Sequence, residues 1–209
     1  AAALYEQQGR LEEEAWLYAN MGPVVALSGD ILRGIEFSRK AENLAGQLSS
    51  EAELLHHISS DLGAMYTETG DWEAAMYEES RALEISQEMH DDAGQIDALL
   101  TLVGINIVRG DVSSARSEAM SALTLAHACG NTVLEAQSLG ALGDASEIAG
   151  QYEQAVREYE RGLTLEAGAP DPETCARLHF SLSVVYDAMG NAVEAAKQRN
   201  LAEAVRLPL

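Results

Sequence analysis

The sequence predicts an all-α protein built from about five helix-turn-helix repeats, with ten to eleven helices in total. Apolar residues recur at helical spacing throughout, and no segment shows the alternation of a β-strand. A glycine followed by a polar residue returns at spacings of 41, 40, 40 and 40 residues; these glycines are Gly29, Gly70, Gly110, Gly150 and Gly190. A fixed period of this size is typical of a solenoid of stacked hairpins.

Each repeat is expected to hold two antiparallel helices joined at its glycine. Eight residues before the glycine stands Met21, Leu62, Leu102, Leu142 or Leu182. Five residues after it stand Gly34, Ala75, Ala115, Ala155 and Ala195, and twelve after it stand Ala41, Ala82, Ala122, Gly162 and Ala202. The glycine allows a tight turn, and the Asp or Asn that follows can cap the next helix. We expect the two helix backbones to approach closely at the small residues.

The whole chain, 1–209, is predicted to form one repeat domain. The repeats are placed at approximately 10–49, 51–89, 91–129, 131–168 and 171–207. In the first repeat, Pro23 falls inside the first helix, where it should bend the helix or delay its start. In the third, the apolar run ALLTLVGINIV is too short to span a bilayer as a helix.

The start of the chain is expected to be the remnant of a preceding repeat. Gly9 lies 20 residues before Gly29, as Gly130 lies 20 before Gly150. Residues 1–8 therefore correspond to the last part of a second helix whose partner is missing. On this basis the sequence is expected to be a piece of a longer protein; the alternative is a short native capping helix.

Residues 62–85 resemble the tetratricopeptide repeat (TPR) family. The matching residues are Leu62, Gly63, Tyr66, Gly70, Trp72, Ala75, Ala82 and Leu83, and the fourth repeat keeps Leu142, Gly143, Gly150, Tyr152, Ala155, Tyr159 and Leu163. The resemblance implies a right-handed α-α superhelix. This repeat, at 40 to 41 residues, is longer than the common one of about 34. Longer repeats of this kind resemble those of bacterial transcription regulators and peptide-sensing regulators.

The resemblance implies a non-catalytic module that binds a peptide or protein on a concave face formed by the first helices. The predicted partner-binding residues are His57, Asp61, Glu68, Asp97, Leu100, Gly104, Ile107, Gln137, Asp144, Glu147, Arg177 and Asp187. An apolar centre with an acidic rim suits a partner that carries basic and aliphatic residues. Alternatively, Leu100 and Ile107 only pack against neighbouring helices. A second function left open is a sensor or oligomerisation segment of a bacterial regulator.

The amino-acid composition limits the classes of partner and the cellular location that we expect for the protein. The formal net charge is −21, from 34 acidic and 13 basic residues, which disfavours nucleic acids and anionic membranes as partners. Cys129 and Cys175 are far apart in the sequence and are expected to be reduced thiols. No secretion signal opens the chain, so a cytoplasmic location is expected. The exposed ends of the array favour a homodimer as a further option.

No enzyme chemistry, metal or cofactor is expected. Glu53, His57 and Asp61 share one helix face and could ligate a metal, but the HExxH arrangement of zinc hydrolases is absent. Such pairs are also ordinary helix-surface stabilisers. The acidic pairs have no Ser or Cys nucleophile motif beside them, and no phosphate-binding glycine loop follows a strand.

Overall fold

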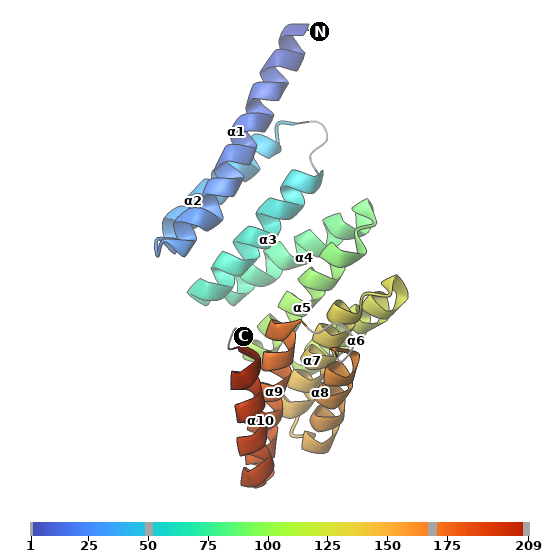
Figure 1. Ribbon diagram of the computed structural model, residues 1–209. Coiled ribbons are helices and arrows are strands. Elements are labelled where there is room, and N and C mark those ends of the chain that lie inside the picture. The colour runs from blue at the N-terminus through green and yellow to red at the C-terminus, as the bar shows by residue number, and fades with distance from the viewer. Residues whose placement is uncertain (1, 49–51, 167–170, 207–209) are drawn as a thin grey trace. The chain divides into compact units, whose positions relative to one another are not determined.

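The computed structural model describes residues 2–48, 52–166 and 171–206, and all regular secondary structure in these ranges is α-helical. The helices are α1 (Ala2–Leu27), α2 (Ile31–Ala45), α3 (Ala52–Thr69), α4 (Trp72–Met89), α5 (Asp92–Arg109), α6 (Val112–Cys129), α7 (Thr132–Ile148), α8 (Tyr152–Glu166), α9 (Pro172–Ala188) and α10 (Ala192–Arg206). The all-α prediction with ten helices is confirmed (Figure 1). In the described part of the chain, no helix is both long and apolar enough to cross a membrane.

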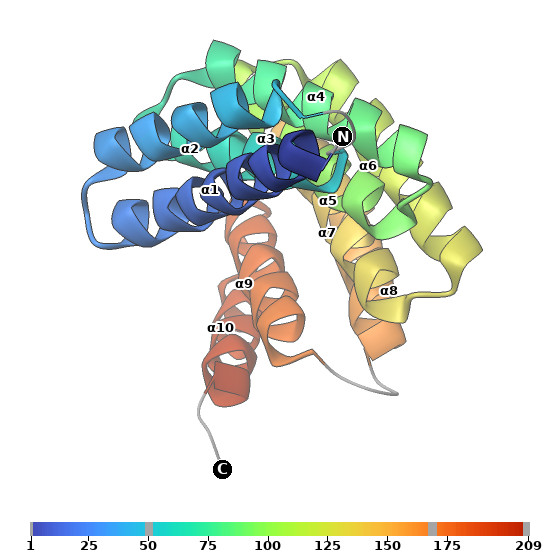
Figure 2. The same ribbon diagram turned by 90° about the horizontal axis from the view of Figure 1, so that it is seen from above.

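The chain forms two compact units, Ala1–Thr101 and Leu102–Leu209, whose boundary falls within α5. In the first unit, α1 packs on α2, α3 packs on α4, and α1 and α2 both contact α3. In the second unit, α7 packs on α8 and α9 on α10, as Figure 2 shows for the last hairpin. Within each unit, successive hairpins therefore bury the helix faces that one hairpin alone would expose.

The five predicted turns all lie between the two helices of a hairpin. Their glycines have positive φ angles of 100°, 77°, 78°, 72° and 76° in chain order, a conformation that residues with a Cβ rarely adopt. The next residue caps the following helix, as predicted, at four turns: the side chains of Asp30, Asp71, Asp111 and Asn191 each accept a backbone N–H three residues on. Gln151 is the exception, and its backbone carbonyl accepts the Gln154 N–H instead.

The start of the chain differs from the prediction. Residues 2–8 continue directly into one long α1, so the chain does not turn at Gly9. Gly9 is followed by Arg10 rather than a capping Asp or Asn, and a glycine inside a helix costs only about 1 kcal/mol relative to alanine. Pro23 lies in the C-terminal part of α1 and does not delay the start of the helix.

The predicted columns of small residues are buried between helices. All ten residues five and twelve positions after the hairpin glycines are buried. A Cβ on Gly34 would lie 2.7 Å from the Gly22 backbone oxygen, and one on Gly162 would lie 3.2 Å from the Ala136 oxygen. A Cβ would overlap the facing backbone at Gly34 and would force a small shift at Gly162, which favours Gly over Ala at these two positions.

A second pair of positions meets inside the hairpins, seven residues before and nine after the turn glycine. A Cβ on Gly63 would lie 2.2 Å from Glu79 Oε1, and one on Gly143 would lie 2.4 Å from Tyr159 Cε1. The missing side chain on the first helix thus makes room for a large one on the second. The third repeat reverses the sizes, with Val103 and Ala119 at these positions.

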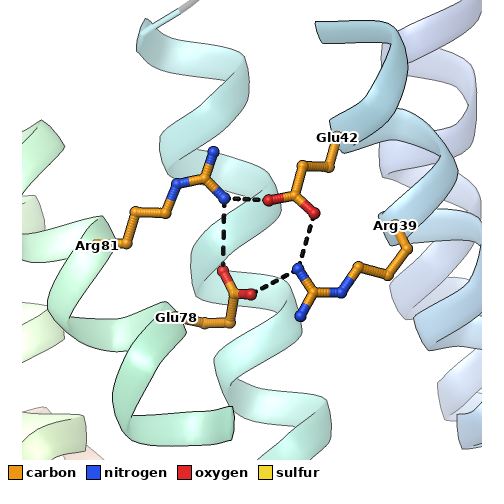
Figure 3. A network of polar contacts seen from close by, with 4 residues as sticks. All are labelled: Arg39, Glu42, Glu78 and Arg81. Atoms are coloured by element: carbon orange, nitrogen blue, oxygen red, sulfur yellow. Dashed lines mark hydrogen bonds and ion pairs between the residues drawn. The ribbon is translucent and has the colours of Figure 1, made fainter. Parts of the chain in front are cut away.

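A ring of alternating charges joins α2 to α4 in the first unit (Figure 3). Arg39 Nη1 lies 2.7 Å from Glu42 Oε2 and 2.7 Å from Glu78 Oε1. Arg81 pairs with Glu42 and lies 3.7 Å from Glu78 Oε2. Burial alone would raise the pKa of Glu42, but the hydrogen bonds from Arg39 and Arg81 outweigh it and the pKa is lowered. The Glu78 side chain is fully buried, so its charge depends on both arginines.

Candidate functional site

The predicted binding residues all lie on the first helices of hairpins, but they belong to two units. In the first unit they are His57, Asp61 and Glu68 on α3 and Asp97 and Leu100 on α5; in the second they are Gly104 and Ile107 on α5, Gln137, Asp144 and Glu147 on α7, and Arg177 and Asp187 on α9. Each unit is considered separately.

The first unit has an open pocket of about 470 Å³ where α3, α4 and α5 meet. Its lining consists of Ser60 and Ala64 from α3, Glu79 from α4, and Asp97, Ala98, Leu100 and Thr101 from α5. Of the predicted residues, Asp97 and Leu100 lie in this lining. The pocket therefore combines carboxyl groups, two hydroxyl groups and a short apolar wall.

Glu79 is a candidate site residue that the sequence prediction missed. Its side chain is only 3% exposed, and within residues 2–48, 52–166 and 171–206 it has no hydrogen bond or ion pair. Burial, with additional repulsion from Asp97 and Glu78, raises its pKa to about 8. A signal was available: Tyr159, two repeats later, occupies the same position with a ring. A carboxyl group in place of a core aromatic is a local departure that marks a candidate site.

The other predicted residues of the first unit lie outside the lining of this pocket. His57 Nε2 is 3.5 Å from Asp61 Oδ2, and the His57 ring lies 5.7 Å from that of Trp16. Burial raises the pKa of Asp61, and the nearby His57 opposes the rise. Glu68 is exposed near the end of α3. In the described residues, no group of three His, Cys, Asp or Glu side chains is arranged to hold a metal ion.

In the second unit, Asp144 and Glu147 converge on Tyr159, and Arg177 pairs with Asp144. The Tyr159 hydroxyl lies 2.7 Å from Asp144 Oδ1 and 3.0 Å from Glu147 Oε2. A phenol has one proton to donate, so it satisfies one of these carboxyl groups at a time. Burial is the main cause that raises the pKa of both Asp144 and Glu147, and the Tyr159 hydrogen bond opposes it. Within this cluster Tyr159 is buried, whereas the side chains of Arg177 and Asp144 are 40% and 34% exposed.

Arg177 supplies the positive charge of that cluster. Its Nη1 donates to Asp144 Oδ2 at 3.3 Å, and its Nη2 donates to the backbone oxygen of Gln137 at 3.3 Å. The Gln137 side chain itself donates to Thr174 Oγ1 at 3.3 Å. The guanidinium lies across Gly140, where a Cβ would come within 2.4 Å of Nη2. Both polar ends of Gln137 are therefore engaged by α9, the side chain by Thr174 and the backbone oxygen by Arg177.

The last three predicted residues of the second unit stand apart from this cluster. Asp187 forms an ion pair with Arg199 of α10. Gly104 is exposed, and a Cβ there would meet nothing within 4 Å. Ile107 is half-buried. Two pockets that were not predicted, of about 210 and 340 Å³, share Glu135 and Arg161 and open among α6, α7 and α8.

No protein-family model matches the sequence, and no curated protein matches it. Solved structures do. The apo form of RapI has a TM-score of 0.81 at 16% identity, over 92% of this chain and 70% of that chain. A Rap protein complexed with Competence and Sporulation Factor has a TM-score of 0.76 at 18% identity, over 92% and 54%.

A third similar structure comes from a eukaryotic protein with TPR-like repeats. The nearly identical TPR-like repeats of a putative kinesin light chain from Podospora anserina have a TM-score of 0.70 at 15% identity, over 95% of this chain and 96% of that chain. Identities this low show the fold alone. The fold they show is a TPR-like array of helical hairpins.

Proposed function

We propose that this chain is a non-catalytic module that binds a peptide or protein segment on the face formed by the first helices of its hairpins. The observation that carries the proposal is the open pocket of about 470 Å³ in the first unit, lined mainly by α3 and α5. Both are first helices of their hairpins.

The chemistry of the pocket supports a side chain of a peptide as its occupant. Leu100, Ala64 and Ala98 can contact an aliphatic stem, while Glu79 and Asp97 can receive a polar end group. The similar Rap structure complexed with Competence and Sporulation Factor offers a precedent on the same fold, although identity is only 18%. The chain spans 54% of that protein.

Selection from a random peptide library displayed on phage tests this function. We expect the intact chain to enrich peptides that compete with one another for one surface. Ala64→Trp, which places a ring in the pocket, should abolish their binding. Ala128→Trp, at an exposed position on α6 outside the three pockets, is the matched control and should leave binding unchanged. Absence of enrichment, or equal binding to the Ala64→Trp variant, would refute the proposal.

A further inference from the structure

The first-unit pocket holds acidic groups without a cation. Glu79 and Asp97 are its charged lining residues, and no Lys, Arg or His belongs to the lining. Glu79 is 3% exposed and its carboxyl group faces the pocket; burial and repulsion from Asp97 and Glu78 act on it, with no hydrogen bond or cation from the described residues to offset them. A buried carboxyl group without a partner is costly, so its presence at a pocket wall points to a ligand that supplies the missing partner.

In the second unit, the positions equivalent to those of the pocket include a cationic side chain from the chain itself. A shift of 80 residues, or two repeats, relates Ala64 to Asp144, Glu79 to Tyr159 and Asp97 to Arg177. In the second unit, Tyr159 and Arg177 both bind Asp144. The Arg177 guanidinium also covers Gly140, the counterpart of Ser60.

In the first unit, the counterparts of these residues leave a pocket. The position of the arginine is taken by the carboxyl group of Asp97, and that of the tyrosine by the carboxyl group of Glu79. The two units thus use related positions in opposite ways. In the second unit Arg177 occupies the place and pairs with Asp144, whereas in the first unit the place is an open pocket lined by Glu79 and Asp97.

Resting on the proposed function, we propose that this pocket receives an arginine side chain of the bound peptide, with its guanidinium between Glu79 and Asp97. A guanidinium offers five donors in a planar fork, which can serve two carboxyl groups and the hydroxyls of Ser60 and Thr101 together. Its aliphatic stem would lie along Leu100. The internal counterpart in the second unit is also a guanidinium, which favours arginine over lysine.

Binding of the guanidinium is coupled to ionisation of Glu79. Burial holds its pKa at about 8, so the free pocket keeps a proton near neutral pH. A cation stabilises the charged form, so binding releases that proton and affinity rises between pH 6 and 9. The other ionisable groups around it are Glu78 on α4, Asp97 on α5, Asp91 beside Asp97, and His56 on α3.

The test is an NMR titration of the full ¹⁵N-labelled chain with N-acetyl-arginine amide. We expect saturable shifts at the backbone amides of Ser60, Ala64 and Ala98. N-acetyl-citrulline amide, which has the same shape without the charge, should cause none, and N-acetyl-lysine amide should bind more weakly than the arginine probe. Equal shifts with citrulline, equal affinity for lysine, or no shifts with arginine would each overturn the proposal.

Substitutions locate the binding in the pocket. Glu79→Gln with Asp97→Asn should weaken affinity for the arginine probe by at least about tenfold, because two charge-assisted contacts are lost. Glu84→Gln, which removes an exposed charge of α4 outside the pocket and away from the first-helix face, is the matched control and should change affinity less than about twofold. If both variants bind alike, the pocket is not the site and the proposal fails.

Copying the second unit into the first gives an independent variant. Ser60→Gly, Ala64→Asp, Glu79→Tyr and Asp97→Arg together should fill the pocket with an internal cation and abolish the shifts; Ser60→Gly is included because the Arg177 guanidinium covers Gly140. Peptides selected from the library that bind through the pocket without arginine would overturn this inference and leave the proposed function intact. A failed library selection with intact arginine binding would refute the proposed function and leave the guanidinium site.

Discussion

Glu79 and Tyr159 are buried polar side chains at the same repeat position, but they differ in whether their polar groups have hydrogen-bond partners. Tyr159 is fully buried and donates to carboxyl groups of α7. Glu79 is equally enclosed but has no partner in the described residues, and its pKa is raised to about 8. At the scale of single residues, burial of the Glu79 carboxyl group lowers stability at high pH, as is expected of a residue kept for binding, the role proposed for it.

Replacement of Glu79 by Gln is expected to change how stability depends on pH. The pKa of Glu79 is raised from 4.5 to about 8 in the folded protein, so the folded state holds the proton more tightly and loses stability as pH rises through that window. The cost reaches a few kcal/mol at about 1.4 kcal/mol per pKa unit. Glu79→Gln should unfold at higher urea concentration than the wild type at pH 9 and at a similar concentration at pH 5. If the variant and the wild type differed in urea midpoint by the same amount at pH 9 and at pH 5, the raised pKa would be contradicted.

Removal of the Tyr159 hydroxyl is expected to weaken the second unit. Tyr159→Phe should lower the free energy of unfolding by about 1–2 kcal/mol, because Asp144 and Glu147 lose their shared donor. The loss should grow as the pH rises, because burial raises the pKa of both carboxyl groups and only their ionised forms need the donor fully. Urea unfolding measures both. Tyr186→Phe, whose hydroxyl makes one exposed contact with Glu160 at 3.4 Å, is the control and should cost less than about 0.5 kcal/mol.

Each hairpin depends on glycine for two different reasons. The turn glycines adopt positive φ, whereas glycines such as Gly63 and Gly143 are helical and make room for a partner side chain. The column of small residues keeps the two helices of a hairpin in contact, so register is set by size as well as by hydrophobicity. The conformation of each turn and the spacing of the two helices in a hairpin therefore depend on residues that lack a Cβ.

A matched pair of alanine substitutions separates these effects. A Cβ on Gly110 or on Gly104 would meet nothing within 4 Å, but only Gly110 has a positive φ, of 78°. Gly110→Ala should therefore destabilise by about 1–2 kcal/mol through backbone strain. Gly104→Ala, inside α5, should stabilise by up to about 1 kcal/mol. Thermal unfolding followed by circular dichroism checks the signs; a stabilising Gly110→Ala would refute the role of the turn.

At the scale of the whole chain, charge is the dominant general feature. The net charge of −21 produces self-repulsion that opposes compact packing. Internal ion pairs such as Arg39–Glu78 and Arg177–Asp144 use the few basic residues to hold neighbouring helices together. With 34 acidic and only 13 basic residues in the sequence, there are too few basic residues to give every carboxyl group a partner of its own.

Salt is accordingly expected to stabilise the protein. At pH 7.5, an increase in NaCl from about 0.05 to 0.5 M should raise the urea midpoint, because the Debye length falls to a few ångströms. The rise should shrink as the pH approaches the isoelectric point of about 4.4. A midpoint that falls with salt at pH 7.5 would show that screening of the ion pairs outweighs relief of the repulsion.

The candidate site could be predicted only in part. First-helix positions followed from the TPR resemblance, and Asp97 and Leu100 indeed line a pocket. The prediction did not separate them from Asp144 and Arg177, which satisfy each other inside the second unit. It also missed Glu79, because the second helices were treated as packing elements. Whether a carboxyl group is open or neutralised depends on residues two helices away, which no local pattern reveals.

The sequence by itself determined the hairpins, their turns and their close contacts, because a repeated pattern of Gly, Asp and small residues acts through local backbone and cap geometry. It misled where that pattern was incomplete, as at Gly9, which lies inside α1. Only the tertiary structure decided which polar groups find partners, because burial and pairing are properties of side chains brought together from different helices. The presence or absence of such partners distinguishes the open acidic pocket at Glu79 from the hydrogen-bonded cluster at Tyr159.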